Sequence, residues 1–486
     1  MKKVIFLFLL FIPISIVSAA ENVTYEVCKS GCDYNNLDTV YANIYNLDKT
    51  KIYNMTINIK DSGEYLISES SLWNKYFSDS SQIIKSTLTF KGTGSENPTI
   101  KPNGHERIGV IDVDHMNFEN INFGHAENAS FSASYNNDTY IFLKNCNFNI
   151  DDLSFNAVTV ELDNIKINSQ YSAFFDKTSF LTIKNSDIKA INGTGDHNGF
   201  RTDSRVKTTI ENTTIEASKF AALNGSKQVT ISNSTITGPV SLTGKKDSII
   251  NSKINGNITT LDSDFTYKNL TINSNDEYAL GVTRNTCGTS FTPTVITEGQ
   301  IENLKIEGNP SIGIYGNGTE LAYKLNINKS DLSKATCSII IDVQNMSPCL
   351  AKTSINQIYP TFLSQNYTDL NAQVKNSKIN CAMVESHSKS LNAGNMYFEG
   401  SNTWTVPISR GTNKNNNNVV ELNKGNIYID FANQDILKLN VDLSKPIIDY
   451  FKDIIPEGKV LGEWKIKDPS ILKVVDGKIV PLKVGV

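Results

Sequence analysis

Residues 208–215 read TTIENTTI and residues 229–236 read VTISNSTI, two copies of one eight-residue phrase. The phrase runs apolar, any, apolar, any, Asn, any, any, apolar. Its Asn recurs in ten copies, at Asn120, Asn145, Asn164, Asn185, Asn212, Asn233, Asn251, Asn269, Asn303 and Asn376. Gly92 and Lys329 take the same place in two further copies. The body of the chain is therefore built from a repeat.

Each half of the phrase alternates apolar and polar residues, which indicates a strand with one buried face. Asn tolerates the left-handed backbone conformation, so one residue can bend the chain between two strands. Copies from Asn120 to Asn269 lie 18 to 27 residues apart, the length of one coil of a parallel β-helix. We predict an all-β fold in which residues 88–425 form a right-handed parallel β-helix. Separate strands of a sandwich, the alternative, do not explain ten Asn at one place.

The Asn side chains are expected to stack along the axis of this solenoid, bond to one another and lie buried beside the core. Asn212, Asn233 and Asn269 also begin Asn-x-Ser/Thr sequons. Because we expect their side chains to be buried, we do not expect these three to carry sugar.

The N-terminal residues 1–20 have the features of a signal peptide. Lys2 and Lys3 precede an apolar stretch, and small residues at 18–20 supply a cleavage site. A membrane anchor, the alternative, needs about 20 apolar residues, and this stretch is shorter. We expect an extracellular chain, secreted or cell-surface associated, with no membrane span after cleavage. The net charge of −4 argues against a nucleic-acid partner.

Residues 21–87 are expected to form a cap and the first coils, because the open end of a solenoid must be covered. A helix over residues 36–47 is predicted from apolar residues at helical spacing: Leu37, Val40, Tyr41, Ile44 and Leu47. Asn35 or Asn36 would cap its start.

Residues 426–486 depart from the repeat. Separate β-runs at 427–431 and 436–443 precede a segment that begins at Trp464. This segment resembles the bacterial Ig-like domains of surface proteins at Trp464, Asp468, Pro469, Ser470, Ile471, Asp476, Gly477, Lys478 and Gly485. The resemblance implies a small β unit with a hairpin at Asp476-Gly477. The family's last strand would follow Gly485, so this unit is expected to lack it.

The repeat itself resembles the pectin-lyase-like β-helix superfamily. That superfamily includes enzymes, adhesins and phage spikes, so the resemblance implies an architecture rather than a reaction.

A catalytic group is best sought in the connection at residues 193–203, where Asp196, His197, Arg201 and Asp203 lie close together in the sequence. A glycosidase needs two carboxyl groups, and a uronate lyase needs a base and a cation. Polygalacturonases of the superfamily add Gly-His-Gly and Arg-Ile-Lys motifs, which this chain lacks. A solvated turn explains the same residues, so no catalytic residue is assigned.

Seven cysteines remain after signal removal, which leaves an odd thiol. Cys28 and Cys32 are the best disulfide candidates, and Cys337 with Cys349 is a second possibility. Zinc is the rival explanation, but no pairs of ligand spacing support it. Asp112 and Asp114 could bridge a calcium ion, although two solvated carboxylates explain them as well. We expect no metal and no cofactor.

Two functions remain open. The first is an adhesin-like interaction protein that contacts polysaccharide or host glycan through ladders of Asn, Ser, Thr and Lys. The second is a polysaccharide lyase or glycoside hydrolase that uses the 193–203 turn.

Overall fold

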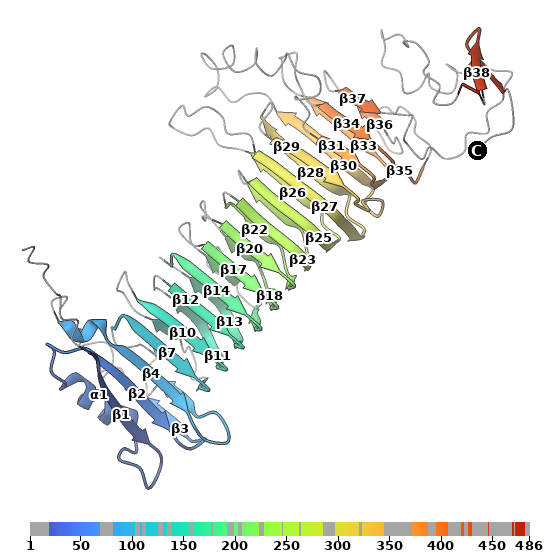
Figure 1. The fold of residues 1–486 in the computed structure, drawn as a ribbon. Coiled ribbons are helices and arrows are strands. Elements are labelled where there is room, and N and C mark those ends of the chain that lie inside the picture. Colours follow the sequence, from blue (N-terminus) through green and yellow to red (C-terminus); the bar gives the residue numbers. More distant parts are fainter. Residues whose placement is uncertain are drawn as a thin grey trace, which may run out of the picture.

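Short strands separated by sharp bends wind into a long rod in which each coil stacks on the previous one (Figure 1). Within the described residues, 35 strands are hydrogen-bonded into one continuous sheet, and neighbouring coils pair in parallel. This confirms the predicted all-β parallel β-helix. The computed structural model describes residues 19–68, 81–102, 107–108, 113–124, 130–133, 139–155, 159–175, 178–191, 199–202, 207–222, 228–244, 246–261, 264–284, 297–319, 323–344, 372–386, 395–406, 419–421, 426–429, 446, 469–470 and 472–481.

The pairings divide the rod into three faces. Face A holds the strands before the bends: β1 (Glu21–Val27), β2 (Tyr53–Ile59), β4 (Thr87–Gly92), β7 (His115–Glu119), β10 (Tyr140–Lys144), β12 (Thr159–Asp163), β14 (Phe180–Lys184), β17 (Lys207–Glu211), β20 (Gln228–Ser232), β29 (Tyr323–Asn328), β31 (Ala372–Lys375), β34 (Asn395–Glu399), β37 (Asn426–Ile429) and the first halves of β23 (Lys246–Asn255), β25 (Asp264–Ser274) and β27 (Thr297–Gly308).

Face B holds the strands after the bends, and face C the strands that follow those. Face B contains β3 (Glu64–Ile67), β5 (Thr99–Pro102), β8 (Asn122–Phe123), β15 (Asp187–Ala190), β18 (Thr214–Ala217), β21 (Thr235–Thr237), β32 (Lys378–Ile379), β35 (Thr403–Trp404), the second halves of β23, β25 and β27, and the first halves of β11 (Asn147–Phe155) and β13 (Lys166–Phe175). Face C contains β6 (Arg107–Ile108), β9 (Ser130–Ala133), the second halves of β11 and β13, β16 (Gly199–Thr202), β19 (Phe220–Ala222), β22 (Val240–Leu242), β24 (Ile258–Leu261), β26 (Tyr278–Arg284), β28 (Ile312–Thr319), β30 (Cys337–Gln344), β33 (Ala382–Ser386) and β36 (Val419–Glu421).

The core runs along the axis as files of like side chains, because successive coils pair in register. On face A, Ile183, Ile210 and Ile231 lie on adjacent rungs and are fully buried. On face C, the rings of Phe155, Phe175, Phe200 and Phe220 follow one another with centroids 4.9–5.5 Å apart. Alternation within each strand thus separates a dry interior from an outer surface of polar side chains.

The N-terminal end of the rod carries the predicted cap. Helix α1 (Leu37–Tyr45) buries Leu37, Val40, Tyr41 and Ile44, and Leu47 packs against the same core while staying partly exposed. The Asn36 side chain accepts a hydrogen bond of 2.8 Å from the Thr39 amide, so Asn36 is the N-cap. A 3-10 turn, η1 (Gln82–Lys85), precedes β4.

The sheet extends past both ends of the predicted repeat region. Strands β1, β2 and β3 precede residue 88, and β37 pairs in parallel with β34 although residues 426–429 were expected in the C-terminal unit. Further on, β38 (Leu472–Val475) and β39 (Lys478–Pro481) form an antiparallel hairpin. Its turn is Asp476-Gly477, with φ of 51° and 72°, as the sequence predicts.

Candidate functional site

At eleven of the described bends from face A to face B, a single residue in the left-handed conformation turns the chain. All ten predicted Asn have φ between 50° and 57°, and Lys329 has φ of 51°. Asn is the non-glycine residue that adopts this conformation most readily, which explains its recurrence. Gly92 is different: it ends β4 in extended backbone, and a Cβ there would lie 2.2 Å from the Asn120 carbonyl oxygen.

The bend side chains form the predicted amide ladder along one corner of the rod. Asn145 Nδ2 donates to Asn120 Oδ1 at 3.0 Å, and Asn164 Nδ2 donates to Asn145 Oδ1 at 2.7 Å. The ladder continues from Asn212 to Asn185 at 3.3 Å, from Asn269 to Asn251 at 2.7 Å and from Asn303 to Asn269 at 2.9 Å.

Local partners replace the ladder at two bends. Asn185 Nδ2 donates to Asp163 Oδ1 at 2.8 Å, because that carboxylate lies directly before the preceding bend. Asn376 Nδ2 donates to Asn328 Oδ1 at 3.0 Å, since the bend residue of that coil is Lys329, which has no side-chain oxygen.

The expected burial of the Asn side chains is wrong. Asn212, Asn233 and Asn269 are exposed, because the bend residue lies at the outer corner while its neighbours point inward. Burial therefore does not protect these three sequons from modification.

A second ladder, which the repeat phrase does not assign, lies one residue further on and inside the rod. Its members, Ser186, Thr213, Ser234, Ser252, Ser330 and Ser377, are buried. The Thr213 amide donates to Ser234 Oγ at 3.1 Å, and Ser234 Oγ donates to the Ser232 carbonyl at 2.7 Å. The same pair of bonds recurs at Ser330, which links the Leu304 amide to the Asn328 carbonyl.

This inner ladder satisfies backbone groups that the bend turns toward the core and away from water. A recurrent Ser or Thr directly after the Asn is the signal that would have predicted it.

A shallow groove of about 600 Å³ follows the corner between faces A and B. Four consecutive bend residues line it, together with side chains from the start of face B: Asn145, Asn164, Asn185, Asn212, Asn97, Asn147, Lys166 and Asp187, with Ile165 and Ser186. Side-chain amides therefore dominate its lining. Lys166 and Asp187 are its charged members, and they lie in register on adjacent rungs. The groove thus offers many hydrogen-bond donors and acceptors and little net charge.

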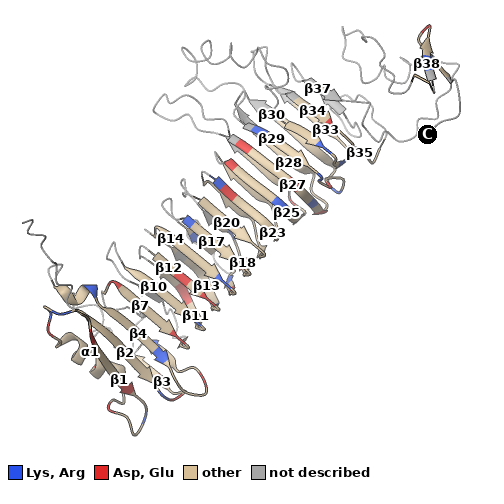
Figure 2. Ribbon diagram, viewed as in Figure 1, with Lys and Arg blue, Asp and Glu red and all other residues tan. Residues whose placement is uncertain are grey.

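Along the face A border of the groove, charges of alternating sign occupy the place directly before the corner in six successive coils. Figure 2 marks the charged residues along the rod. In register order the six border charges are Lys91, Glu119, Lys144, Asp163, Lys184 and Glu211. Lys91 and Glu119 are 3.2 Å apart, and Lys184 and Glu211 are 3.7 Å apart. All four side chains are substantially exposed, so each pair stabilises the rod weakly. Together they keep this border close to neutral.

Among the described residues, no sequence candidate for catalysis lies in this groove. Arg201 lies in β16 on face C and is partly buried, whereas the groove lies between faces A and B. Asp196, His197 and Asp203 fall outside the described residues, as does Asp112. His115 is exposed on face A, with its ring centroid 5.6 Å from that of Tyr140.

The cysteines follow the prediction in part. Cys28 and Cys32 form the expected disulfide, with an S–S distance of 2.11 Å. Cys337 bonds to Cys381 instead of Cys349, because Cys337 begins β30 and Cys381 directly precedes β33, its neighbour on face C. Cys146 is a buried free thiol, and burial raises its pKa to about 12. Cys287 and Cys349 fall outside the described residues.

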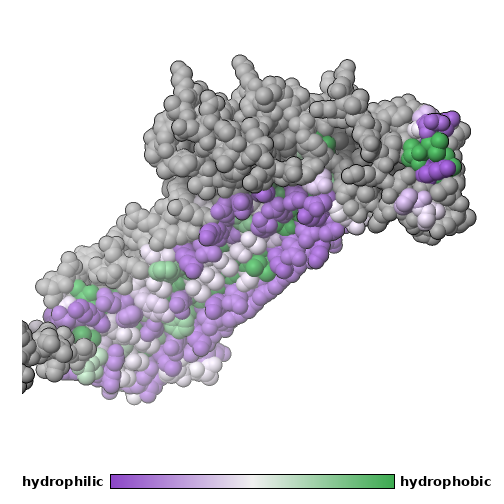
Figure 3. All heavy atoms as spheres, turned by 45° about the horizontal axis from the view of Figure 1, so that its top comes forward, coloured by the Kyte–Doolittle hydropathy of each residue, from purple (hydrophilic) through white to green (hydrophobic). Residues whose placement is uncertain are grey.

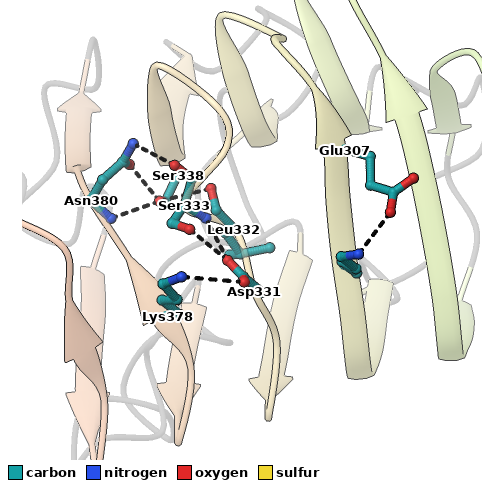
Figure 4. Close-up of polar contacts among 8 residues, drawn as sticks. Glu307, Asp331, Leu332, Ser333, Ser338, Lys378 and Asn380 are labelled. Carbon is teal, nitrogen blue, oxygen red and sulfur yellow. Dashed lines mark hydrogen bonds and ion pairs between the residues drawn. The ribbon is translucent and has the colours of Figure 1, made fainter.

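Figure 4 shows a polar cluster that includes Ser338 and Asn380, the sequence neighbours of the disulfide-bonded Cys337 and Cys381. Asn380 Nδ2 donates to the Ser333 carbonyl, and Ser338 Oγ donates to Asn380 Oδ1 at 2.6 Å. Asp331 accepts from Ser333 Oγ at 2.6 Å and pairs with Lys378 at 3.7 Å. Burial alone would raise the Asp331 pKa, but these partners lower it overall. Because the cluster's groups bond to one another, we assign it a structural role.

Among the described residues, no three His, Cys, Asp or Glu side chains lie close enough together to hold a metal ion. No helix within that part of the chain has the length and apolar character needed to cross a membrane. Comparison of the chain with protein-family models, curated protein sequences and solved structures found no match.

Proposed function

We propose that the protein is an exported, adhesin-like glycan-binding protein that contacts polysaccharide through the amide-lined corner groove. The observation that carries the proposal is a hollow of about 600 Å³ with side-chain amides from successive coils along one wall. An amide presents a donor and an acceptor side by side, which matches neighbouring sugar hydroxyls.

The groove is rigid, which favours binding by such small polar contacts. Its Asn residues have a fixed backbone conformation and bond to one another, and the buried Ser/Thr ladder holds the backbone behind them. A preorganised site loses less conformational freedom on binding. Much of the described surface seen in Figure 3 is hydrophilic, with scattered apolar residues, so weak polar contacts suit it better than an apolar interface.

Two sequence features support the proposed location outside the cell. Residues 1–20 have the composition of a signal peptide, and the resemblance of the last 60 or so residues to bacterial Ig-like domains suits a surface protein. The pectin-lyase-like resemblance of the rod is compatible with a binding role, since that architecture serves adhesins as well as enzymes.

A glycan array probed with the mature chain tests the proposal. In the groove variant, Asn164→Gly with Asn212→Gly, two amides are removed while the left-handed bends remain accessible. In the matched control, Asn269→Gly with Asn303→Gly, the same change is made in the ladder outside the groove.

We expect the groove variant to lose at least about tenfold in affinity for the glycan that the array identifies, and the control to stay close to the parent. Thermal unfolding of both variants shows whether the rod is intact. No glycan binding by the parent, or equal losses in the two variants, would show that the groove is not the site.

A further inference from the structure

The groove also indicates which glycans it accepts. Resting on the proposed function, we infer that it binds an uncharged, extended polysaccharide of the β-1,4-linked hexose type, lying parallel to the rod axis.

The direction follows from how the chemistry repeats. Asn145, Asn164, Asn185 and Asn212 come from successive coils, so a similar amide recurs at about 4.8 Å along the axis, over about 14 Å in total. Across the axis the lining changes within a few residues, from the charges of face A through the amides to face B. A polymer of one repeating unit can therefore make the same contact several times only if it lies along the axis. The advance per sugar of an extended β-1,4-linked chain is close to the strand spacing.

The preference for an uncharged chain follows from the charge pattern. Inside the groove, Lys166 and Asp187 have opposite signs on adjacent rungs. On the face A border, Asp163, Lys184 and Glu211 continue the alternation. Opposite charges this close together cancel within the screening length of about 8 Å at physiological salt. A uronate chain would meet attraction and repulsion in turn while its carboxylates lose hydration.

Two matched ligands test the inference on the full mature chain: β-1,4-mannan oligosaccharides and β-1,4-mannuronate oligosaccharides, which differ at the carboxylate. By titration calorimetry we expect the mannan series to bind at least about tenfold more tightly, a difference of about 1.4 kcal/mol. Affinity for mannan should be nearly unchanged between low and high salt, and it should rise with chain length until the oligomer spans the groove.

A variant probes the charge argument. Asp187→Asn leaves Lys166 without its opposite charge in the groove, so affinity for mannuronate should rise several-fold at low salt and the gain should vanish at high salt. The control Glu216→Gln removes one negative charge from face B outside the groove, beside Lys189, and should not produce this gain.

Tighter binding of mannuronate than mannan by the parent would overturn the inference, and so would binding of neither series. The outcome for the proposed function is read separately on the array. A protein that binds array glycans through the groove but prefers charged or branched ones supports that function and contradicts the inference.

Discussion

The two side chains at each bend, one residue apart, face opposite environments. Asn233 is exposed at the corner, whereas Ser234 directly after it is buried. The left-handed backbone conformation favours Asn, and the exposed amide, which bonds to its neighbours at most of these bends, keeps further donor and acceptor capacity for solvent or a ligand. The Ser is required by backbone groups in the interior, which it bonds on both sides. Adjacent residues of one repeat therefore differ in what they can do: the outer amide is accessible to a ligand, and the inner hydroxyl stabilises the interior.

The largest expected effect is on the chemical reactivity of Cys146, the buried residue directly after the bend residue Asn145. Burial raises the pKa of this thiol from 9.0 to about 12, so its thiolate population at pH 8 falls by about 1000-fold. Iodoacetamide should modify Cys146 at least that much more slowly in the native chain than in urea, as measured by mass spectrometry of its peptide. Comparable rates in the two states would show that the inner ladder is open to solvent.

Breaking the inner ladder should cost the most stability. Ser234→Val strands the buried Thr213 amide by removing its acceptor, and it also removes one of two donors to the Ser232 carbonyl, which keeps its bond from the Asn212 amide. We expect the free energy of unfolding to fall by roughly 3 kcal/mol, read from urea midpoints. Ser248→Ala, on the outward side of face A, should cost less than about 0.5 kcal/mol. Equal costs for the two substitutions would contradict the proposed division of roles.

A smaller loss of stability is expected from substitution of the exposed bend residue Asn233. Asn233→Leu puts a side chain that disfavours the left-handed conformation at φ of 50° and should cost roughly 1–2 kcal/mol. Asn233→Gly loses the same amide but accepts that conformation, so its cost should be clearly lower. Urea unfolding of both variants separates the two contributions. If Leu and Gly cost the same, the amide rather than the backbone determines stability here.

The smallest effect is expected in the charge ladder. Glu211→Lys places two positive side chains on adjacent rungs with Lys184, yet both sites are exposed, so the loss should stay below about 1 kcal/mol. Melting curves at low and high salt should show the loss shrinking as salt rises. Glu211→Gln, which removes attraction without adding repulsion, should lose less. A loss independent of salt would show that the cause is not electrostatic.

The bends could be predicted from sequence because one conformational requirement is repeated ten times with one residue type. Cap helix α1 could be predicted because its apolar spacing is local. The disulfide partner of Cys337 could not be predicted, because Cys381 becomes its neighbour only through the stacking of coils. The groove was missed for a related reason. Asn97, Asn147 and Lys166 are ordinary polar residues in the sequence, and the register brings them together.

The alternating charges also bear on how such a rod changes length in evolution. Where signs alternate from Lys91 to Glu211, adding or losing one coil brings like charges onto adjacent rungs, whereas a change of two coils keeps the alternation. Farther along, Ser232 and Ile250 hold the same places without charge. At those uncharged rungs a single coil can be gained or lost without a like-charge contact. Growth and shortening of the protein are therefore expected to be concentrated there, away from the amide groove.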